Sequence, residues 1–279
     1  LNEAPYAKKI AEHLGADHTE LYVHMDDMKD IIPKIPKIYS EPFADSSQIP
    51  TFLVSELASK HVKVALSGDA GDELFGGYNR YFWSKRIWSK ISWMPLAFRQ
   101  RLGRVIEGIP THKLDTAYGV LEHLLPKNLH VNQFGYKASK LAVRLRNVSS
   151  LEDLYLSLVK EWQASSCLQF DTNQKSYVLN NQLQKFSQLD FRERMMYWDS
   201  MSYLPDDILC KVDRAAMHNS LETRCPFLDP TVIDAAWNTP LEYKFRKNSG
   251  KLILKSILSK YIPLELFERP KAGFAVPID

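Results

Sequence analysis

The first part of the chain alternates between helical patterns and short β-prone runs. Apolar residues recur at helical spacing over residues 4–14, and two prolines break the apolar run over residues 26–36 into pieces. Residues 19–23 have the pattern of a strand, and residues 62–66 form a β-branched run typical of a buried parallel strand. This order of helix, strand, helix and strand predicts an α/β fold with a parallel sheet.

From Tyr78 onward the pattern becomes helical. Residues 81–200 carry aromatic-rich helical spacings without a convincing strand, and residues 249–263 repeat them. No linker, internal repeat or low-complexity tract separates the two parts. We therefore expect residues 1–80 to carry the sheet and residues 81–279 to form a mostly α-helical part that packs on it.

Composition and charge narrow the classes of protein. The 279 residues carry 36 Lys and Arg against 33 Asp and Glu, which argues against a whole-surface field for nucleic acid. The strongly apolar runs are short, far from the roughly 20 residues that a membrane helix needs. Cys167, Cys210 and Cys225 are widely spaced and odd in number, which favours a reduced cytoplasmic setting over disulfides or zinc. A homo-oligomer stays open.

Four of the 11 glycines lie within ten residues, directly after the run over residues 62–66. Ser67 and Gly68 come first, at the carboxyl end of the predicted strand, where open α/β sheets bind ligands. Glycine permits the close backbone approach that a phosphate often requires. The competing interpretation is a plain turn that caps a helix. The strand before it and the acids after it favour a ligand loop.

Three carboxylates stand in the same loop, at Asp69, Asp72 and Glu73. They would repel a phosphate unless a hard cation such as Mg²⁺, shared between a carboxylate and the phosphates, lay between them. Neither a Walker A pattern nor a GxGxxG pattern is present in the sequence. The loop is therefore predicted to be a phosphate site of another kind.

Two further segments combine charged with apolar residues. Over residues 203–217 we expect a helix whose charged side chains pack against the fold. Over residues 221–229 we expect a buried ion-pair cluster. The main interpretation is structural: ion pairs that hold the helical part on the sheet. The charged residues concerned are Lys211, Asp213, Arg214, Glu222, Arg224 and Asp229. Near the end of the chain, Lys271 stands in a loop framed by Pro and Gly, from which a lysine can reach a phosphate. On its own that loop would be interpreted as a solvated basic turn.

Taken in this order, the segments resemble the synthetase domain of glutamine-dependent asparagine synthetases, a branch of the PP-loop ATP pyrophosphatases. The resemblance spans nearly the whole chain and is weakest from about 85 to 190. The matching stretches are 2–8 (NEAPYAK), 41–47 (EPFADSS), 66–78 (LSGDAGDELFGGY), 203–229 and 269–274 (RPKAGF).

The resemblance implies an α/β fold with a truncated parallel sheet of the PP-loop ATP pyrophosphatase type and a large, mostly α-helical C-terminal part. It also implies an ATP-dependent carbon–nitrogen ligase of the asparagine synthase type. In that reaction the side-chain carboxylate of aspartate attacks the α-phosphate of ATP, which gives β-aspartyl-AMP and pyrophosphate. Ammonia then displaces AMP and yields asparagine.

By resemblance, Leu66, Ser67 and Gly68 match the ATP-binding stretch of the family. Asp72 matches the acid that binds Mg²⁺ and pyrophosphate, so ATP and Mg²⁺ are the small molecules that the resemblance implies. Asp69 stands where many members have a glutamate that assists proton removal from the attacking ammonia. The shorter side chain would act from a slightly different distance.

Two more matches concern catalysis and the acyl substrate. Lys271 matches the catalytic lysine of the family, whose ammonium group would offset the charge that accumulates on the α-phosphate. The loop of Asp45, Ser46 and Ser47 corresponds to a region near the acyl substrate.

Two features of the family do not occur in this sequence. No N-terminal Cys and no glutaminase domain precede the synthetase part, so ammonia would have to come from elsewhere. No SGGxDS sequence occurs in the 279 residues, although in the family that loop wraps the pyrophosphate. We therefore interpret the chain as the distal part of a synthetase domain and expect little or no synthetase activity from it alone.

Two alternatives stay open at this point. One is an amidotransferase of the same fold that acts on another carboxylate, such as a sugar acid in surface-polysaccharide synthesis or a β-lactam precursor. The other is a non-catalytic binding module that retains the fold. Intact Ser67, Gly68, Asp72 and Lys271 argue against loss of function.

Overall fold

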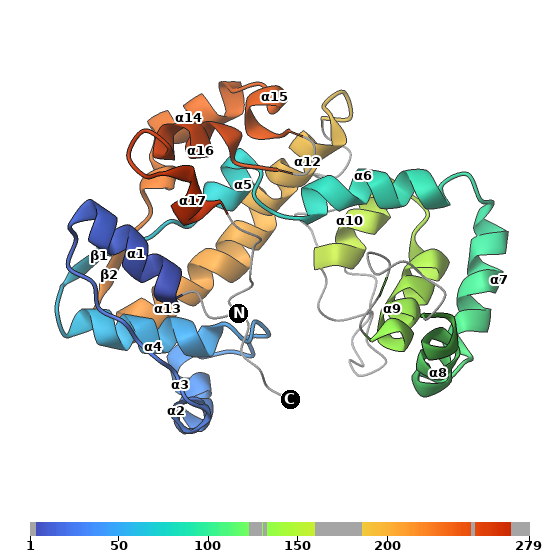
Figure 1. The fold of residues 1–279 in the computed structure, drawn as a ribbon, viewed down its shortest axis with the longest axis horizontal. Coiled ribbons are helices and arrows are strands. Elements are labelled where there is room, and N and C mark those ends of the chain that lie inside the picture. Colours follow the sequence, from blue (N-terminus) through green and yellow to red (C-terminus); the bar gives the residue numbers. More distant parts are fainter. Residues whose placement is uncertain (1–3, 123–129, 131–132, 160–185, 247–248, 269–279) are drawn as a thin grey trace. The chain divides into compact units, whose positions relative to one another are not determined.

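The structure is a computed structural model that describes residues 4–122, 130, 133–159, 186–246 and 249–268. The chain divides into two compact units (Figure 1). The first unit consists of residues 1–78, 173–189 and 193–279, and the second consists of residues 79–172 and 190–192.

A two-stranded parallel sheet lies in the first unit. Strand β1 (Val64–Leu66) pairs with strand β2 (Glu222–Arg224), and Ala65 lies opposite Thr223. The amide of Ser67 extends the ladder by donating a hydrogen bond of 2.9 Å to the carbonyl of Arg224. The parallel sheet and the mostly helical remainder agree with the predicted α/β class in its coarse form.

Two details of the sheet were predicted wrongly. Residues 19–23 are irregular, because they have no strand beside them in the described part of the chain. The strand β1 was expected to be buried, yet Val64 is 49% exposed and Leu66 is 73% exposed. Among the described residues β1 has a strand neighbour on one side only, so the cover that a parallel strand usually has is incomplete.

The other regular elements of the first unit, as far as it is described, are helices. Their bounds are α1 (Ala4–Leu14), α2 (Met25–Ile31), η1 (Ile32–Lys34), α3 (Ile35–Tyr39), α4 (Gln48–Ser59), α5 (Gly71–Phe75), α12 (Phe191–Trp198, in this unit from residue 193), η3 (Asp199–Leu209), α13 (Cys210–His218), η4 (Pro226–Leu228), α14 (Pro230–Asn238), α15 (Leu241–Lys244), α16 (Leu252–Leu258) and α17 (Leu264–Phe267). Prolines stand in the first turn of η1 and of α3, which confirms the predicted break.

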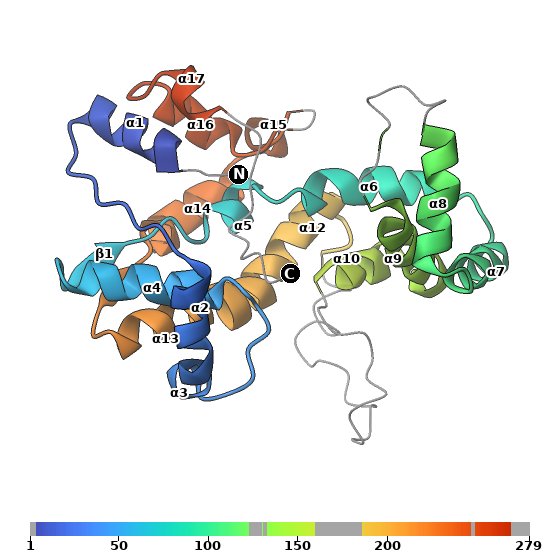
Figure 2. The same cartoon turned by 60° about the horizontal axis from the view of Figure 1, so that its bottom comes forward.

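Two hydrophobic cores lie among the described residues of this unit. In the first, α4 lies beside α13 (Figures 1 and 2), and Tyr39, Phe52 and Ala215 are buried between α3, α4 and α13. In the second, Leu74 and Ala236 are buried where α5 meets α14 and η3.

The segment η3 is a π-helix of 11 residues that runs directly into α13. Pro205 lies inside it and has no amide to donate, which interrupts a regular α-helical ladder. The sequence predicted a helix here, but not its wider winding.

The second unit is helical in its described part. Its helices are α6 (Arg80–Ile91), α7 (Leu96–Glu107), α8 (Thr111–Glu122), α9 (Phe134–Asn147) and α10 (Leu151–Val159). Helix α7 crosses α9 closely because Gly103 has no side chain; a Cβ there would lie 2.7 Å from the carbonyl oxygen of Ala142. Buried Arg99 fixes the end of α9 by donating to the carbonyl of Val148 at 2.8 Å.

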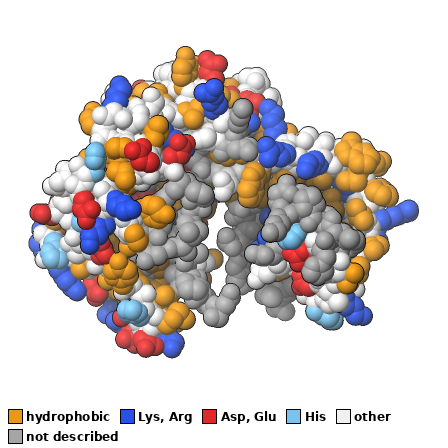
Figure 3. Space-filling view, viewed as in Figure 1, with side chains coloured by type: hydrophobic (Ala, Val, Ile, Leu, Met, Phe, Trp, Pro, Cys, Tyr) orange, Lys and Arg blue, Asp and Glu red, His pale blue; other side chains and the backbone are white. Residues whose placement is uncertain are grey.

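Acidic and basic side chains alternate over the face of the first unit that Figure 3 shows, with hydrophobic side chains between them. This mixture fits the nearly balanced charge of the sequence. In the described part of the chain, no helix combines the length and the apolar character that crossing a membrane requires.

Candidate functional site

The candidate site begins where the two parallel strands end. Ser67 follows β1, and its Oγ donates a hydrogen bond of 2.8 Å to Asp69 Oδ2. The same Oγ lies 3.2 Å from the Sγ of Cys225, the residue that follows β2. The ligand loop predicted at the carboxyl end of a parallel strand is therefore in that position, with the end of the second strand beside it.

In this loop one glycine, Gly68, is exposed, and an alanine, Ala70, adopts the left-handed backbone conformation. Gly68 is exposed and has no heavy atom within 4 Å of the position that a Cβ would take, so a ligand can approach its backbone. The left-handed conformation falls on Ala70, which has a φ of 70° and is buried at the start of α5. Gly68 itself has no positive φ, whereas Gly76, later in the same glycine cluster, has a φ of 73°.

Asp72 and Glu73 are neighbours in the sequence but face different surroundings. Asp72 Oδ2 lies 3.1 Å from Lys251 Nζ, and both side chains are 28% exposed. Glu73 is buried, and the hydroxyl of Tyr78 donates to its Oε1 at 2.6 Å. Burial raises the pKa of Glu73 above its usual value, although the hydrogen bond from Tyr78 acts in the opposite direction. Of these two acids, only Asp72 is accessible to a ligand.

The sequence did not identify Lys251 as a site residue. Its amide donates to the carbonyl of Phe75 at 3.1 Å, which fixes the start of α16 against the end of α5. This contact places the Lys251 ammonium group beside Asp72, although the two residues lie far apart in the sequence. The only local signal is a Ser-Gly-Lys sequence at the beginning of a predicted helix, which is too common to mark a site.

Asp72, which pairs with Lys251 in this structure, would offer one carboxylate to a magnesium ion that arrived with a nucleotide. In the described ranges no group of three or more His, Cys, Asp or Glu side chains could hold a metal ion. Mg²⁺ usually binds through one or two carboxylates and completes its shell with water and substrate phosphates. A single accessible carboxylate at Asp72 meets that need.

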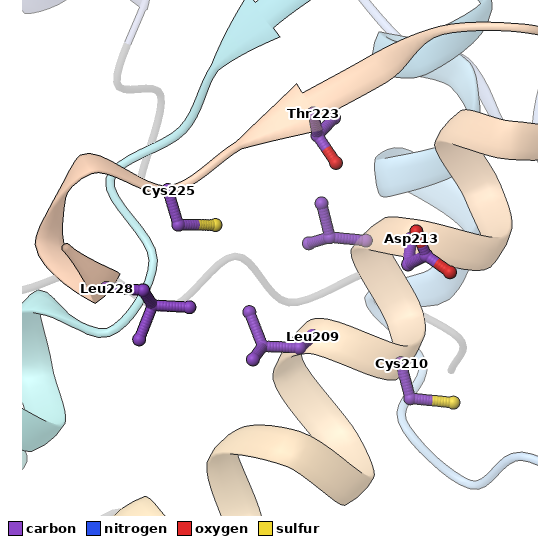
Figure 4. A pocket seen from close by; sticks show the side chains of 7 residues that line it. Leu209, Cys210, Asp213, Thr223, Cys225 and Leu228 are labelled. Carbon is purple, nitrogen blue, oxygen red and sulfur yellow. The ribbon is translucent and has the colours of Figure 1, made fainter. Parts of the chain in front are cut away.

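A pocket of about 410 Å³ adjoins the loop through Cys225. In Figure 4 the side chain of Leu209 points into it from the end of η3, and Cys225 and Leu228 face it from the β2 side. The described residues that line it are Leu209, Cys210, Val212, Asp213, Thr223, Cys225 and Leu228, and none of these is basic.

Two other segments from the sequence analysis meet on the first turn of α13. Lys211 is 7% exposed, and its Nζ donates to Asp45 Oδ2 and, at 2.8 Å, to Ser47 Oγ. Burial pushes the pKa of Asp45 upward, but the hydrogen bonds from Lys211 and Ser47 outweigh it and hold the pKa below its usual value. The predicted acyl-substrate loop and the predicted charged segment are thus in contact.

The remaining charged residues behave differently from one another. Arg214 pairs with Glu41 at 2.6 Å, whereas Asp213 is exposed at the pocket. The expected buried cluster over residues 221–229 is not buried: Arg224 and Glu222 are 3.5 Å apart with side chains 68% and 51% exposed. They flank Thr223 on β2, and both side chains point to solvent.

Asp229 serves as a helix cap rather than as an ion-pair partner. Its Oδ1 accepts a hydrogen bond of 2.8 Å from the amide of Thr231 at the start of α14. This contact lowers the pKa of Asp229 below its usual value. Lys271, the expected catalytic lysine, lies outside the described residues.

The comparisons with known proteins agree on one family. A family model described as asparagine synthase matches residues 1–279. A Mycobacterium tuberculosis (strain H37Rv) protein with a provisional name as a glutamine-hydrolysing asparagine synthetase is 32% identical over 277 residues, which are 99% of this chain and 39% of that protein. The glutamine-hydrolysing asparagine synthetase 1 of Bacillus subtilis is 31% identical over 285 residues, 99% of this chain and 40% of that protein. The chain thus spans about two fifths of the length of these relatives. No solved structure matches the chain at a significant level.

Proposed function

The chain belongs to the asparagine synthase family, and on that premise we propose that it forms part of an ATP-dependent synthetase that converts aspartate and ammonia into asparagine. One observation supports this most directly. The loop after β1 brings Ser67 and Asp69 to the ends of two parallel strands, and Asp72 stands accessible in the same loop.

In this proposal the exposed backbone of Gly68 and the hydroxyl of Ser67 contact the nucleotide. The carboxylate of Asp72 would hold Mg²⁺, which would neutralise charge on the phosphates when ATP is bound. Lys251 would then exchange its ion pair with Asp72 for a contact with phosphate oxygens, because an ammonium group binds either anion. Asp69, held by Ser67, would accept a proton from the attacking ammonia.

Adenylation and amidation would require residues beyond these 279. The sequence contains no SGGxDS stretch, the loop that the resemblance assigns to pyrophosphate. We therefore expect that the 279 residues alone bind Mg²⁺·ATP but form little AMP from ATP, aspartate and ammonia.

Nucleotide binding tests the proposal. Isothermal titration calorimetry of the 279-residue chain with Mg²⁺·ATP should give saturable binding that Asp72→Asn weakens about tenfold or more. Asp234→Asn is the matched control, because Asp234 is an exposed acid on α14 and should leave affinity unchanged. A folded chain that gives no binding heat with ATP at millimolar concentration would contradict the proposal.

The acyl specificity is tested with adenylate mimics. Non-hydrolysable acyl sulfamates of adenosine bind without pyrophosphate, so they do not need the SGGxDS loop. The mimic that carries a β-aspartyl group should bind more tightly than mimics that carry a sugar acid or a larger amino acid. Tighter binding of a sugar-acid mimic would indicate that the substrate is a carboxylate other than aspartate.

A further inference from the structure

One helix contacts both ends of the predicted acyl-substrate loop. Residues 40–47 connect α3 to α4 and are called the Asp45 loop below. Lys211 and Arg214 lie one turn apart on α13, and both reach toward this loop from the same helix. The contacts join parts of the sequence that are more than 160 residues apart, at 166 for Lys211 and Asp45.

Lys211 contacts three side chains, Asp45 and Ser47 by hydrogen bonds and Asp207 at 4.0 Å between Nζ and Oδ1. Asp45 Oδ2 accepts from both Lys211 and Ser47 Oγ, and Ser47 Oγ in turn accepts from Lys211 at 2.8 Å. Asp45 Oδ1 accepts from the amide of Ser47 at 2.8 Å. The ammonium group of Lys211 therefore lies between two carboxylates, those of Asp45 and Asp207, and its own charge is compensated within the cluster.

The second contact holds the start of the loop. Arg214 donates to the carbonyl of Tyr39, at the end of α3, and pairs with Glu41 at 2.6 Å. Tyr39 is fully buried, and its hydroxyl donates to the carbonyl of Gln48 at 3.3 Å, so both ends of the loop are tied to the same core.

The first turn of α13 also forms a wall of the pocket. Cys210, Val212 and Asp213 line the pocket, and Lys211 stands between them in the sequence. The opposite wall includes Cys225, which contacts Ser67 of the nucleotide loop. A shift of this turn would therefore move the Asp45 loop and the pocket wall together.

We infer that Lys211 and Arg214 clamp the Asp45 loop onto α13 and that Lys211 is a positioning residue for the acyl substrate. This inference rests on the proposed function for the identity of the substrate. Lys211 acts through Asp45 and Ser47, because its charge is already paired and it is nearly buried. A buried ion pair is often no more stabilising than apolar side chains of the same size, so its use here is to fix one geometry of the loop.

The experiment compares Lys211→Met with Lys211→Arg in the 279-residue chain, with Lys37→Met as the control for an exposed lysine. Affinities for Mg²⁺·ATP and for the β-aspartyl adenylate mimic are measured by calorimetry. Lys211→Met should weaken binding of the mimic about 10- to 100-fold and change ATP affinity less than about twofold, because the proposal places the Asp45 loop beside the acyl group and not beside the phosphates. Lys211→Arg should recover much of the lost affinity, and Lys37→Met should match the wild type.

A second measurement does not depend on any ligand. Amide hydrogen exchange should be faster over residues 40–47 in Lys211→Met than in the wild type, by a larger factor than the general increase that lower global stability causes in α14. Equal mimic affinity in Lys211→Met and wild type would overturn the positioning role. If the wild type binds no adenylate mimic, the proposed function fails instead, and unchanged exchange in the loop would then overturn the clamp.

Discussion

Gly77 lies so close to Asp72 that a Cβ on it would stand 1.6 Å from Asp72 Oδ1 and 2.4 Å from Lys251 Cε. Both atoms belong to the ends of flexible side chains, which can move away at small cost in stability. We predict that Gly77→Ala displaces the Asp72 carboxylate from its present position and thereby weakens binding of Mg²⁺·ATP about tenfold. Calorimetry measures the affinity, and urea unfolding should show a loss of only about 1 kcal/mol.

Unchanged nucleotide affinity in folded Gly77→Ala would mean that the position of the Asp72 carboxylate does not matter for binding. Asp234→Asn again serves as the control for a change of surface charge alone.

The neighbouring glycine gives the opposite expectation. Gly76 has a φ of 73°, and a Cβ on it would lie 2.0 Å from the ring of buried Phe245. Gly76→Ala therefore adds backbone strain to overpacking, and we predict a loss of about 2–5 kcal/mol in the free energy of unfolding. Denaturant unfolding measures this. A loss below about 1 kcal/mol would contradict the packing around Gly76, since neither the ring nor the turn can then be rigid.

The pair of Lys211 and Asp45 should show strong coupling in stability. Lys211→Met leaves a mostly buried carboxylate without its partner, and we predict a loss of about 3–5 kcal/mol at neutral pH. Adding Asp45→Asn removes that charge, so the double variant should be more stable than Lys211→Met. Urea unfolding of the four proteins gives the coupling energy, and a value near zero would contradict the pairing.

The pH dependence of this pair follows from the lowered pKa of Asp45. A carboxyl group whose pKa is lower in the folded state stabilises the fold above its unfolded pKa and loses this contribution as pH falls through the folded pKa. The stability of the wild type relative to the double variant should therefore fall as the pH drops from about 4 to more acidic values, measured by urea unfolding at each pH.

Glu73 should give the opposite slope. Burial raises its pKa, so the folded state favours the protonated form, and this contribution to stability is lost as pH rises through the folded pKa. Glu73→Gln stays neutral and can still accept the hydrogen bond from Tyr78. We predict that its stability relative to the wild type increases from pH 4 to pH 7, measured by thermal unfolding. A constant difference over that range would show that Glu73 titrates normally.

The sequence predicted the elements whose signal is local. The glycine and acid cluster after an apolar run located the ligand loop, and the prolines near residue 33 located the break between helices. The strand over residues 222–224 was missed because only three residues pair, and its partner lies in a remote part of the chain. The strand predicted over residues 19–23 was wrong because strand formation needs a partner: these residues are β-prone in composition but have no neighbouring strand in the described structure.

Side-chain pairing was harder to predict than the elements. The sequence showed that residues 211–214 carry charges among apolar residues, but not that Lys211 reaches Asp45, because that contact depends on how α4 packs on α13. The Glu222 and Arg224 pair has the same composition, yet it is exposed, because a strand sends residues two apart to the same face. How much an ion pair contributes to stability depends on its burial, and burial is set by the packed fold rather than by the local sequence.

Lys244 is a charged side chain that lies almost entirely buried. It is 2% exposed, and its ammonium group lies 5.4 Å from the centre of the Trp237 ring. Burial lowers the pKa of Lys244, although the nearby charge of Glu193 acts in the opposite direction. A lysine with a lowered pKa destabilises the fold below its folded pKa, and this effect fades as the pH rises toward the usual pKa of lysine.

We predict that Lys244→Met is as stable as the wild type or about 1 kcal/mol more stable at pH 7, and that the difference shrinks toward pH 10. Lys37→Met, at an exposed site, should show neither effect. A loss of more than about 2 kcal/mol in Lys244→Met would mean that the contacts with Trp237 and Glu193 outweigh the desolvation of the charge.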